Sequence, residues 1–147
     1  MRLLAAVAAL LCLAAPASAQ DAQGATSVRG SCTKLVLAGE DAVGSCGGKL
    51  TRMTLPDGAL FLIFTSGQTM IGFSGRVADE HAQGDETTWP VGFVNIGAPG
   101  AEPNAIPARG SCRSGDLNRA SAAIVCSATT AQGAFEAAFR SGRSTNR

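Results

Sequence analysis

Residues 49–65 read KLTRMTLPDGALFLIFT. This stretch predicts two strands, over residues 49–55 and 59–65, joined by the turn Pro56-Asp57-Gly58. Proline fixes its own φ and glycine supplies a positive φ, so the combination is typical of a tight reversal of the chain. The second run is almost continuously apolar, as expected for a strand that is covered on both faces. The stretch therefore favours β-structure with tight turns.

The rest of the chain repeats this pattern of short apolar runs separated by Gly, Pro and Asp. No segment has a convincing helical period. Pro90, which falls inside one of the runs, suggests an edge strand or a bulge. The other expected strands span residues 32–38, 69–74, 89–96, 105–112, 122–128 and 134–140. We therefore expect an all-β fold, a small antiparallel sandwich or barrel of about seven or eight short strands.

One rival interpretation is helical. Residues 120–140 contain many good helix formers, and Phe135 and Phe139 could share one helix face. Against a helix, Gly133 interrupts the segment, and Phe135, Ala137 and Phe139 also alternate as a strand requires. We therefore favour the strand interpretation for residues 120–140. The side chains expected in the core are Leu35, Leu37, Leu60, Leu62, Phe64, Phe73, Phe93, Phe135 and Phe139.

Residues 1–19 have the features of a secretory signal peptide. Arg2 precedes an apolar run from Leu3 to Ala15, and Ala17-Ser18-Ala19 is the small-x-small pattern that signal peptidase cleaves. The run is short for a bilayer span and no stop-transfer segment follows; an uncleaved N-terminal anchor is the alternative. We expect cleavage after Ala19, leaving residues 20–147 as a single disulfide-braced β domain without a membrane span. Its expected location is periplasmic or extracellular.

Cleavage also removes Cys12, so five cysteines become four, an even number in an oxidising compartment. Three pairings are then possible. The local pairing joins Cys32 to Cys46 and Cys112 to Cys126, and a hairpin folded midway between each pair would bring its cysteines opposite one another. The alternative joins Cys32 to Cys112 and Cys46 to Cys126; we favour the local pairing. The spacing lacks the close Cys-x2-Cys pairs of a structural zinc site.

The tetrapeptide Arg-Gly-Ser-Cys occurs twice, at residues 29–32 and 109–112, and each copy is followed by thirteen residues and another cysteine. With a gap of five residues, the match extends over residues 29–68 and 109–143. These segments are candidate repeats of a hairpin-plus-strand unit, weighed against coincidence in a chain rich in Gly, Ala and Ser. Duplication predicts two disulfide-bonded hairpins in equivalent places, related by a rough two-fold axis.

The layout resembles that of uncharacterised small exported bacterial proteins with two cysteine pairs. The shared pattern consists of a signal peptide and four further features, which are Cys32 to Gly39, Pro56 to Gly58, Phe73 to Gly75, and the pair Cys112 and Cys126. The resemblance covers most of the mature chain. It implies a fold class and a compartment, and it supplies no activity and no site.

The mature chain is close to neutral, because loss of Arg2 leaves eleven basic residues against eleven acidic ones. A neutral chain offers no electrostatic reason to bind nucleic acid or an anionic membrane. The charge is nevertheless uneven. Residues 69–108 carry one basic and five acidic side chains, and residues 109–147 carry six basic and two acidic. This polarity could steer a partner, but we favour mutual neutralisation of neighbouring sheet faces.

Candidate catalytic chemistry is sparse. The single histidine, His81, lies among acidic residues, and with Asp79, Asp85 and Glu86 it makes a weak candidate metal site. The spacing is not that of a calcium loop, so a solvated acidic turn is the favoured interpretation. The chain has no nucleophile elbow and no phosphate-binding loop. We therefore predict no catalytic residues and no cofactor.

Three function classes remain. We expect a non-catalytic binding or interaction module of the cell envelope, whose partner is an envelope or extracellular protein; a secreted enzyme inhibitor is a special case. A metal-dependent enzyme using the 79–86 loop and a purely structural envelope protein are the alternatives. The binding surface is expected in the long loops of residues 75–88 and 97–105, around His81 and the turn at Pro99.

Overall fold

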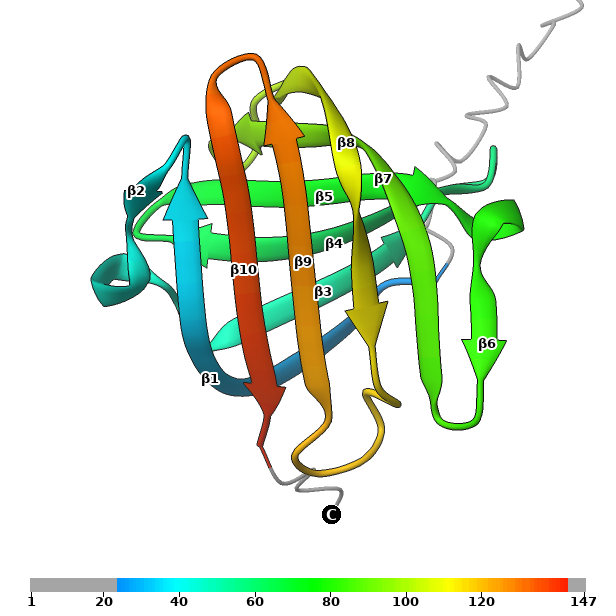
Figure 1. The fold of residues 1–147 in the computed structure, drawn as a ribbon. Coiled ribbons are helices and arrows are strands. Elements are labelled where there is room, and N and C mark those ends of the chain that lie inside the picture. Colours follow the sequence, from blue (N-terminus) through cyan, green and yellow to red (C-terminus); the bar gives the residue numbers. More distant parts are fainter. Residues whose placement is uncertain (1–23, 143–147) are drawn as a thin grey trace, which may run out of the picture.

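Strands dominate the computed structural model, which describes residues 24–142 (Figure 1). Within these residues there are ten β-strands, two single-turn 3-10 helices and no α-helix. The all-β prediction is therefore confirmed. The predicted signal peptide and its cleavage site lie outside the described residues.

Eight of the strands form a closed wall. They are β1 (Thr26–Leu37), β3 (Lys49–Thr54), β4 (Ala59–Ser66), β5 (Thr69–Arg76), β7 (Glu86–Gly97), β8 (Asn104–Ser114), β9 (Ala123–Thr130) and β10 (Gly133–Ser141). Each pairs antiparallel with the next, and β10 closes the sheet by pairing with β1. Two short strands, β2 (Glu40–Asp41) and β6 (His81–Gln83), pair with β1 and β7 outside this cycle. The fold is an up-and-down antiparallel barrel.

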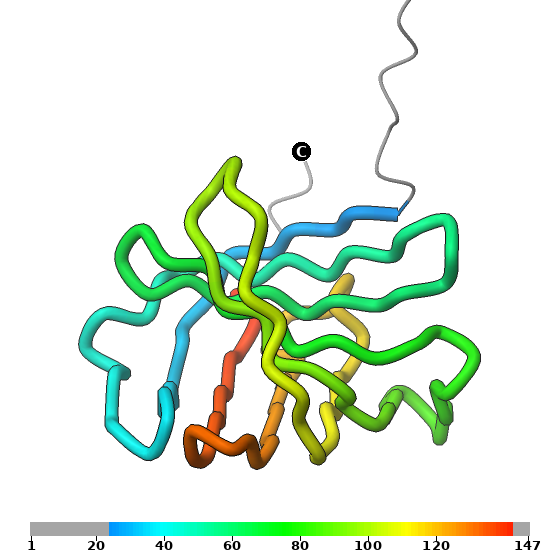
Figure 2. The backbone as a smooth tube through the Cα atoms, turned by 90° about the horizontal axis from the view of Figure 1, so that it is seen from above, coloured from blue at the N-terminus to red at the C-terminus, as the bar shows by residue number. Residues whose placement is uncertain are grey.

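The barrel has two groups of strands that cross each other. In Figure 1, β8, β9 and β10 run down the front while β3, β4 and β5 cross behind them, and Figure 2 shows the same arrangement from above. Strand β1 bends from one group to the other, because residues 26–29 pair with β3 and residues 30–36 pair with β10. This bend closes the barrel.

The eight strands predicted from the sequence all fall on these eight barrel strands. The helical alternative for residues 120–140 is wrong, since this segment forms β9 and β10. The Pro56-Asp57-Gly58 turn is confirmed. Gly58 has φ 85°, its N–H donates to Leu55 O at 2.9 Å, and the Asp57 carboxylate accepts from the Ala59 N–H at 2.9 Å.

Side chains fill the barrel interior. Seven of the nine predicted core residues are buried, and Leu37 packs against the core while remaining partly exposed. Phe93 was predicted wrongly: 48% of it is exposed. The β7–β8 register shifts between Val91 and Phe93, so that Val94 faces the interior and Phe93 faces outward. The buried aromatic rings are Phe64, Phe73, Trp89, Phe135 and Phe139.

Both predicted disulfides are present, and the local pairing is confirmed. Cys112 lies directly opposite Cys126 on β8 and β9, with a Cα separation of 4.1 Å. The first pair, Cys32 and Cys46, has a Cα separation of 5.9 Å and a different geometry, because the β1–β2 ladder contains only two residue pairs. Cys46 instead forms an isolated bridge with Ser66 at the end of β4. Two disulfides indicate a non-reducing compartment.

The two RGSC segments occupy non-equivalent places. They lie in β1 and β8, the first and sixth of the eight barrel strands, and these run in opposite directions because each neighbour is antiparallel. Their strand partners also differ, with β10 and β3 beside β1, and β7 and β9 beside β8. The predicted equivalence of the two hairpins is therefore wrong. Common ancestry of the segments stays a prediction from the sequence.

Close backbone packing explains why both segments contain glycine. A Cβ on Gly30 would collide with the carbonyl oxygen of Arg140, and a Cβ on Gly110 would collide with that of Ser127. At Gly30, β1 passes from one strand partner to another, and near Gly110 the β7–β8 register shifts. Glycine therefore permits a bend in each of these long strands.

This packing yields a stability prediction. Replacing Gly110 with alanine is expected to destabilise the protein by about 1–3 kcal/mol, because the backbone of β9 must move to admit the methyl group. The matched change Gly72→Ala has room, since its nearest neighbour would be Asn95 Cβ at 3.6 Å. We expect it to stabilise by about 0.4–1 kcal/mol. Urea unfolding measures both, and equal effects would contradict the packing argument.

Candidate functional site

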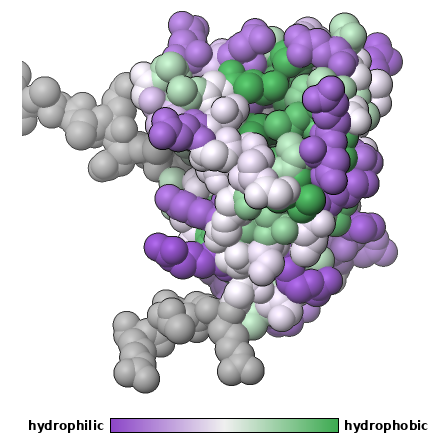
Figure 3. Space-filling model, turned by 90° about the vertical axis from the view of Figure 1, so that its left-hand side faces the viewer, coloured by the Kyte–Doolittle hydropathy of each residue, from purple (hydrophilic) through white to green (hydrophobic). Residues whose placement is uncertain are grey.

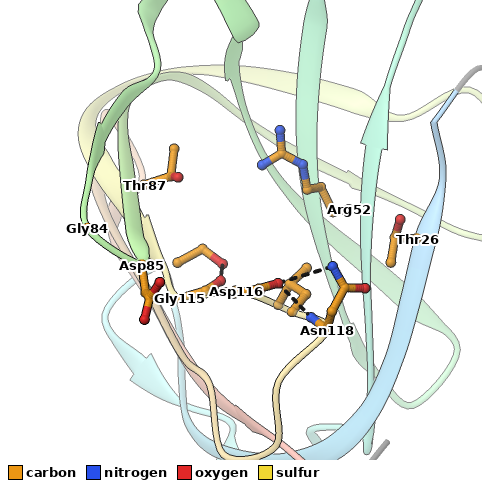
Figure 4. Close-up of a pocket in the computed structure, with 10 residues that line it drawn as sticks. Thr26, Arg52, Gly84, Asp85, Thr87, Gly115, Asp116 and Asn118 are labelled. Atoms are coloured by element: carbon orange, nitrogen blue, oxygen red, sulfur yellow. Dashed lines mark hydrogen bonds between the residues drawn. The ribbon is translucent and has the colours of Figure 1, made fainter. Parts of the chain in front are cut away.

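A polar cavity of about 420 Å³ lies at one end of the barrel (Figure 4). We call it the mouth cavity. Its walls come from the start of β1, from β3, from the β6–β7 turn, and from the end of β8 with the loop that follows. Thr26, Arg52, Thr87 and Asn118 are among the side chains that line it. Four chain segments far apart in the sequence therefore meet at this opening.

Arg52 is a partly buried charged side chain in the wall of this cavity. Its guanidinium lies 5.8 Å from the centre of the Trp89 ring and donates a hydrogen bond to Glu80 Oε1 at 2.5 Å. Glu80 directly follows the 3-10 helix η2 (Val77–Asp79), and the side chains of Arg52 and Glu80 are 27% and 20% exposed. A charge that is partly removed from water is stabilised by a partner of opposite sign. Glu80 and the aromatic ring together hold the guanidinium in place.

The β8–β9 loop forms a fixed wall of the mouth cavity. Asp116 Oδ1 accepts hydrogen bonds from the backbone N–H and the side-chain amide of Asn118, at 2.9 and 3.1 Å. Arg119 donates to Asp85 Oδ2 at 2.8 Å, which ties the loop to the β6–β7 turn. On the other side, Ser141 Oγ donates to Arg119 O at 2.8 Å. The part-buried Ser141 hydrogen bond anchors the loop, and the exposed Arg119–Asp85 pair adds little to it.

The four candidate metal ligands do not converge. His81 is exposed on β6, Asp85 pairs with Arg119, and Glu86 lies 3.5 Å from Arg113. Within residues 24–142, no group of three or more histidine, cysteine or acidic side chains could hold a metal ion. The acidic segment instead neutralises arginines of β8 and its loop. This pairing agrees with the favoured interpretation of the charge polarity.

A second hollow lies on the outside of the barrel, along β5; we call it the outer groove. The outward residues of β5, Gly72 and Ser74, form its floor, between Phe61 and Ile63 of β4 and Asn95 of β7. It consists of two adjoining hollows of about 320 and 480 Å³ that share two wall residues, Phe61 and Asn95. The groove exists because β5 places small residues between larger ones on its neighbours.

The 320 Å³ part of the outer groove is almost entirely apolar. Met53, Leu55 and Met70 line it, and the β7–β8 loop closes one side. Beside the other part lies Phe93, the most exposed large apolar side chain of the described residues. The predicted loop of residues 97–105 thus borders a hollow. Apolar residues also gather between charged ones on the side of the barrel drawn in Figure 3.

Hydrogen bonds fix the one amide in the groove wall. Asn95 Nδ2 donates to Ser74 Oγ at 2.9 Å and approaches Gly72 O at 3.5 Å. The Ser74 hydroxyl in turn donates to Phe93 O at 3.3 Å. No hydrogen bond within residues 24–142 uses Asn95 Oδ1. The amide oxygen therefore remains as an acceptor.

Sequence reasoning missed Arg52, Trp89 and both hollows. The alternation of residues 49–54 does place Arg52 on the same face as Leu50, which is buried. An arginine on the apolar face of a strand is a usable signal for a polar barrel end. No comparable sequence pattern indicates the outer groove, because the groove depends on which strands become neighbours in the sheet.

No protein-family model, curated protein or solved structure matches the chain. The described residues include no helix with the length and apolarity needed to cross a membrane. The function must therefore be argued from the two hollows themselves.

Proposed function

We propose that the chain is an exported, non-catalytic binding module that holds an extended, apolar segment of a partner polypeptide in the outer groove. The observation that carries this proposal is the half-enclosed apolar hollow beside the β7–β8 loop, on the outside of a barrel whose interior is filled by its own side chains. Exposed apolar surface of this kind marks interaction sites. The two disulfides support export, to the periplasm or the outside of the cell.

The shape of the groove favours an extended chain. It follows β5 from Met70 to Arg76, and one strand of that length spans about 20 Å. Alternate side chains of an extended segment could point down onto Gly72 and Ser74, where the floor is lowest. The apolar walls would then contact those side chains on both flanks.

The free amide oxygen favours a polypeptide over a lipid chain. Asn95 lines both hollows, and its Oδ1 can accept a hydrogen bond from a backbone N–H. An acyl chain has no donor to offer and would leave this acceptor without a partner, at a cost in free energy. The open end carries both Arg76 and Asp79, so it does not select a partner of one charge.

A groove-filling substitution tests the proposal. The variant Gly72→Leu projects a large side chain into the groove and should weaken partner binding at least about tenfold. Gly44→Leu is the matched control, because a Cβ there has no atom within 4 Å and Gly44 is absent from the groove lining. The bait is the oxidised mature chain, residues 20–147, incubated with an envelope extract.

The supporting result has two parts. One protein is retained by the wild type and by Gly44→Leu but not by Gly72→Leu, and a photoreactive residue at Phe61 cross-links to an apolar segment of it. Equal retention by all three baits would overturn the groove as the binding site. If the captured protein is an enzyme whose activity falls on binding, the module acts as an inhibitor.

A further inference from the structure

The mouth cavity shares no lining residue with the outer groove, and its chemistry is different. We infer that the mouth cavity is a second binding site, for a small neutral polyhydroxylated molecule of the saccharide class. The inference is independent of the proposed protein partner. It depends on the charge balance, the hydrogen-bonding groups and the rigidity of the cavity wall.

The charged groups around the cavity are mostly paired within the protein, with two arginines facing three carboxylates, so that one negative charge is in excess. The Arg52 guanidinium is paired with Glu80 at 2.5 Å. Arg119 lies 2.8 Å from Asp85 and 3.7 Å from Asp116. At the partly buried Arg52–Glu80 pair an ionic ligand would have to compete with the existing partner. The Arg119–Asp85 pair is largely exposed and resists such competition less. A neutral ligand avoids that competition.

The same wall retains unused hydrogen-bonding capacity of both kinds. A guanidinium has five N–H donors, and one hydrogen bond within residues 24–142 ties Arg52 to Glu80. Asp85 binds Arg119 through Oδ2 only, which leaves Oδ1 as an acceptor. The hydroxyls of Thr26 and Thr87 line the cavity and can both donate and accept. Hydroxyl groups, which also do both, are the complementary chemistry on a ligand.

Contacts within the protein also preorganise the wall of the mouth cavity. Arg52 is held by Glu80 on one side and by the Trp89 ring on the other. Hydrogen bonds from Asn118 to Asp116 and from Ser141 to Arg119 O order the β8–β9 loop. Prior ordering of this kind lowers the entropy that binding must otherwise lose. The volume, about 420 Å³, falls within the range of small-molecule sites and suits one or two sugar rings.

Fluorescence of a tryptophan beside the mouth cavity can report ligand binding. Trp89 is the single tryptophan of the sequence, and the Arg52 guanidinium lies over its ring. A ligand that contacts Arg52 should change the environment of the indole and therefore its fluorescence. Amide shifts of Gly84 and Asn118 in nitrogen-15 NMR spectra provide a second readout, from the β6–β7 turn and the β8–β9 loop.

The test titrates the oxidised mature chain with the neutral sugars glucose, N-acetylglucosamine and cellobiose, and with the charged analogues glucuronic acid and glucosamine. We expect a saturable signal from at least one neutral sugar and weaker binding of the charged analogues. Thr87→Val, which removes one cavity hydroxyl at nearly constant volume, should weaken binding about tenfold. Thr88→Val is the matched control, since Thr88 neighbours Thr87 on β7 and is absent from the cavity lining.

Three results would overturn the inference. They are the absence of a saturable signal up to about 10 mM of every neutral sugar, tighter binding of a charged analogue, and equal behaviour of Thr87→Val and Thr88→Val. The outer-groove variant Gly72→Leu should bind sugar like the wild type. A failure at one site is therefore distinguishable from a failure at the other.

Discussion

Truncating Phe139 to alanine is expected to lower the free energy of unfolding by about 3–5 kcal/mol, and Phe64→Ala should cost a similar amount. Phe139 is 2% exposed and Phe64 is 1% exposed, so each substitution leaves a cavity inside the barrel. Phe64 also meets Phe73 edge to face, with ring centres 5.8 Å apart. Urea unfolding with the disulfides intact measures both losses.

Phe93 provides the control for this prediction. It carries the same side chain, but 48% of it is exposed on the outside of β7. Phe93→Ala should therefore change stability by less than about 1 kcal/mol. A loss at Phe93 as large as that at Phe139 would mean that Phe93 faces the core and that the β7–β8 register does not shift between Val91 and Phe93.

The contrast between these phenylalanines shows what a sequence pattern can and cannot predict. Phe64 and Phe139 lie in unbroken alternation with other apolar residues, and their burial was predicted correctly. Phe93 also lies in an apolar run, but the register shift after Val91 reverses the side that it faces. A bulge depends on the pairing with β8, and a single strand contains no information about it.

Barrel closure was beyond sequence reasoning for a similar reason. The eight strand segments were predicted because each has its own apolar run and turn signals. Closure depends on β1 pairing with β10 across almost the entire chain, and a sandwich would use the same local patterns. The strands β2 and β6, of two and three residues, are too short to produce a period.

The candidate sites were predicted less well than the fold. The acidic segment around His81 was interpreted as a solvated turn, but it includes the short strand β6, and its partners Arg113 and Arg119 are brought to it by the β7–β8 pairing. The 97–105 loop, where a binding surface was expected, borders a hollow, and binding there stays a prediction. The floor of the outer groove, at Gly72 and Ser74, was not predicted, because small residues in a strand give no indication of function by themselves.

The two disulfides should differ in their contribution to stability although they close loops of equal length. Each spans a sequence separation of 14 residues, for which the chain-entropy model gives about 3 kcal/mol. Cys112 and Cys126 are fully buried in the core, whereas Cys32 and Cys46 are partly exposed and pack at its edge. Removing the second pair therefore costs packing as well as loop entropy.

We expect the double variant Cys112→Ala/Cys126→Ala to be less stable than Cys32→Ala/Cys46→Ala by about 1 kcal/mol or more, the cost of the cavity left by two buried sulfur atoms. Replacing both cysteines of a pair avoids a free thiol in either variant. In the wild type, mild reduction followed by alkylation should label Cys32 and Cys46 first, because the other bridge is shielded until the barrel opens. Equal stability losses would show that loop entropy alone accounts for both bridges. A larger loss for the exposed pair would mean that Cys32–Cys46, by holding β2 and its 3-10 helix η1 (Val43–Ser45) against the barrel, protects more of the fold than its burial indicates.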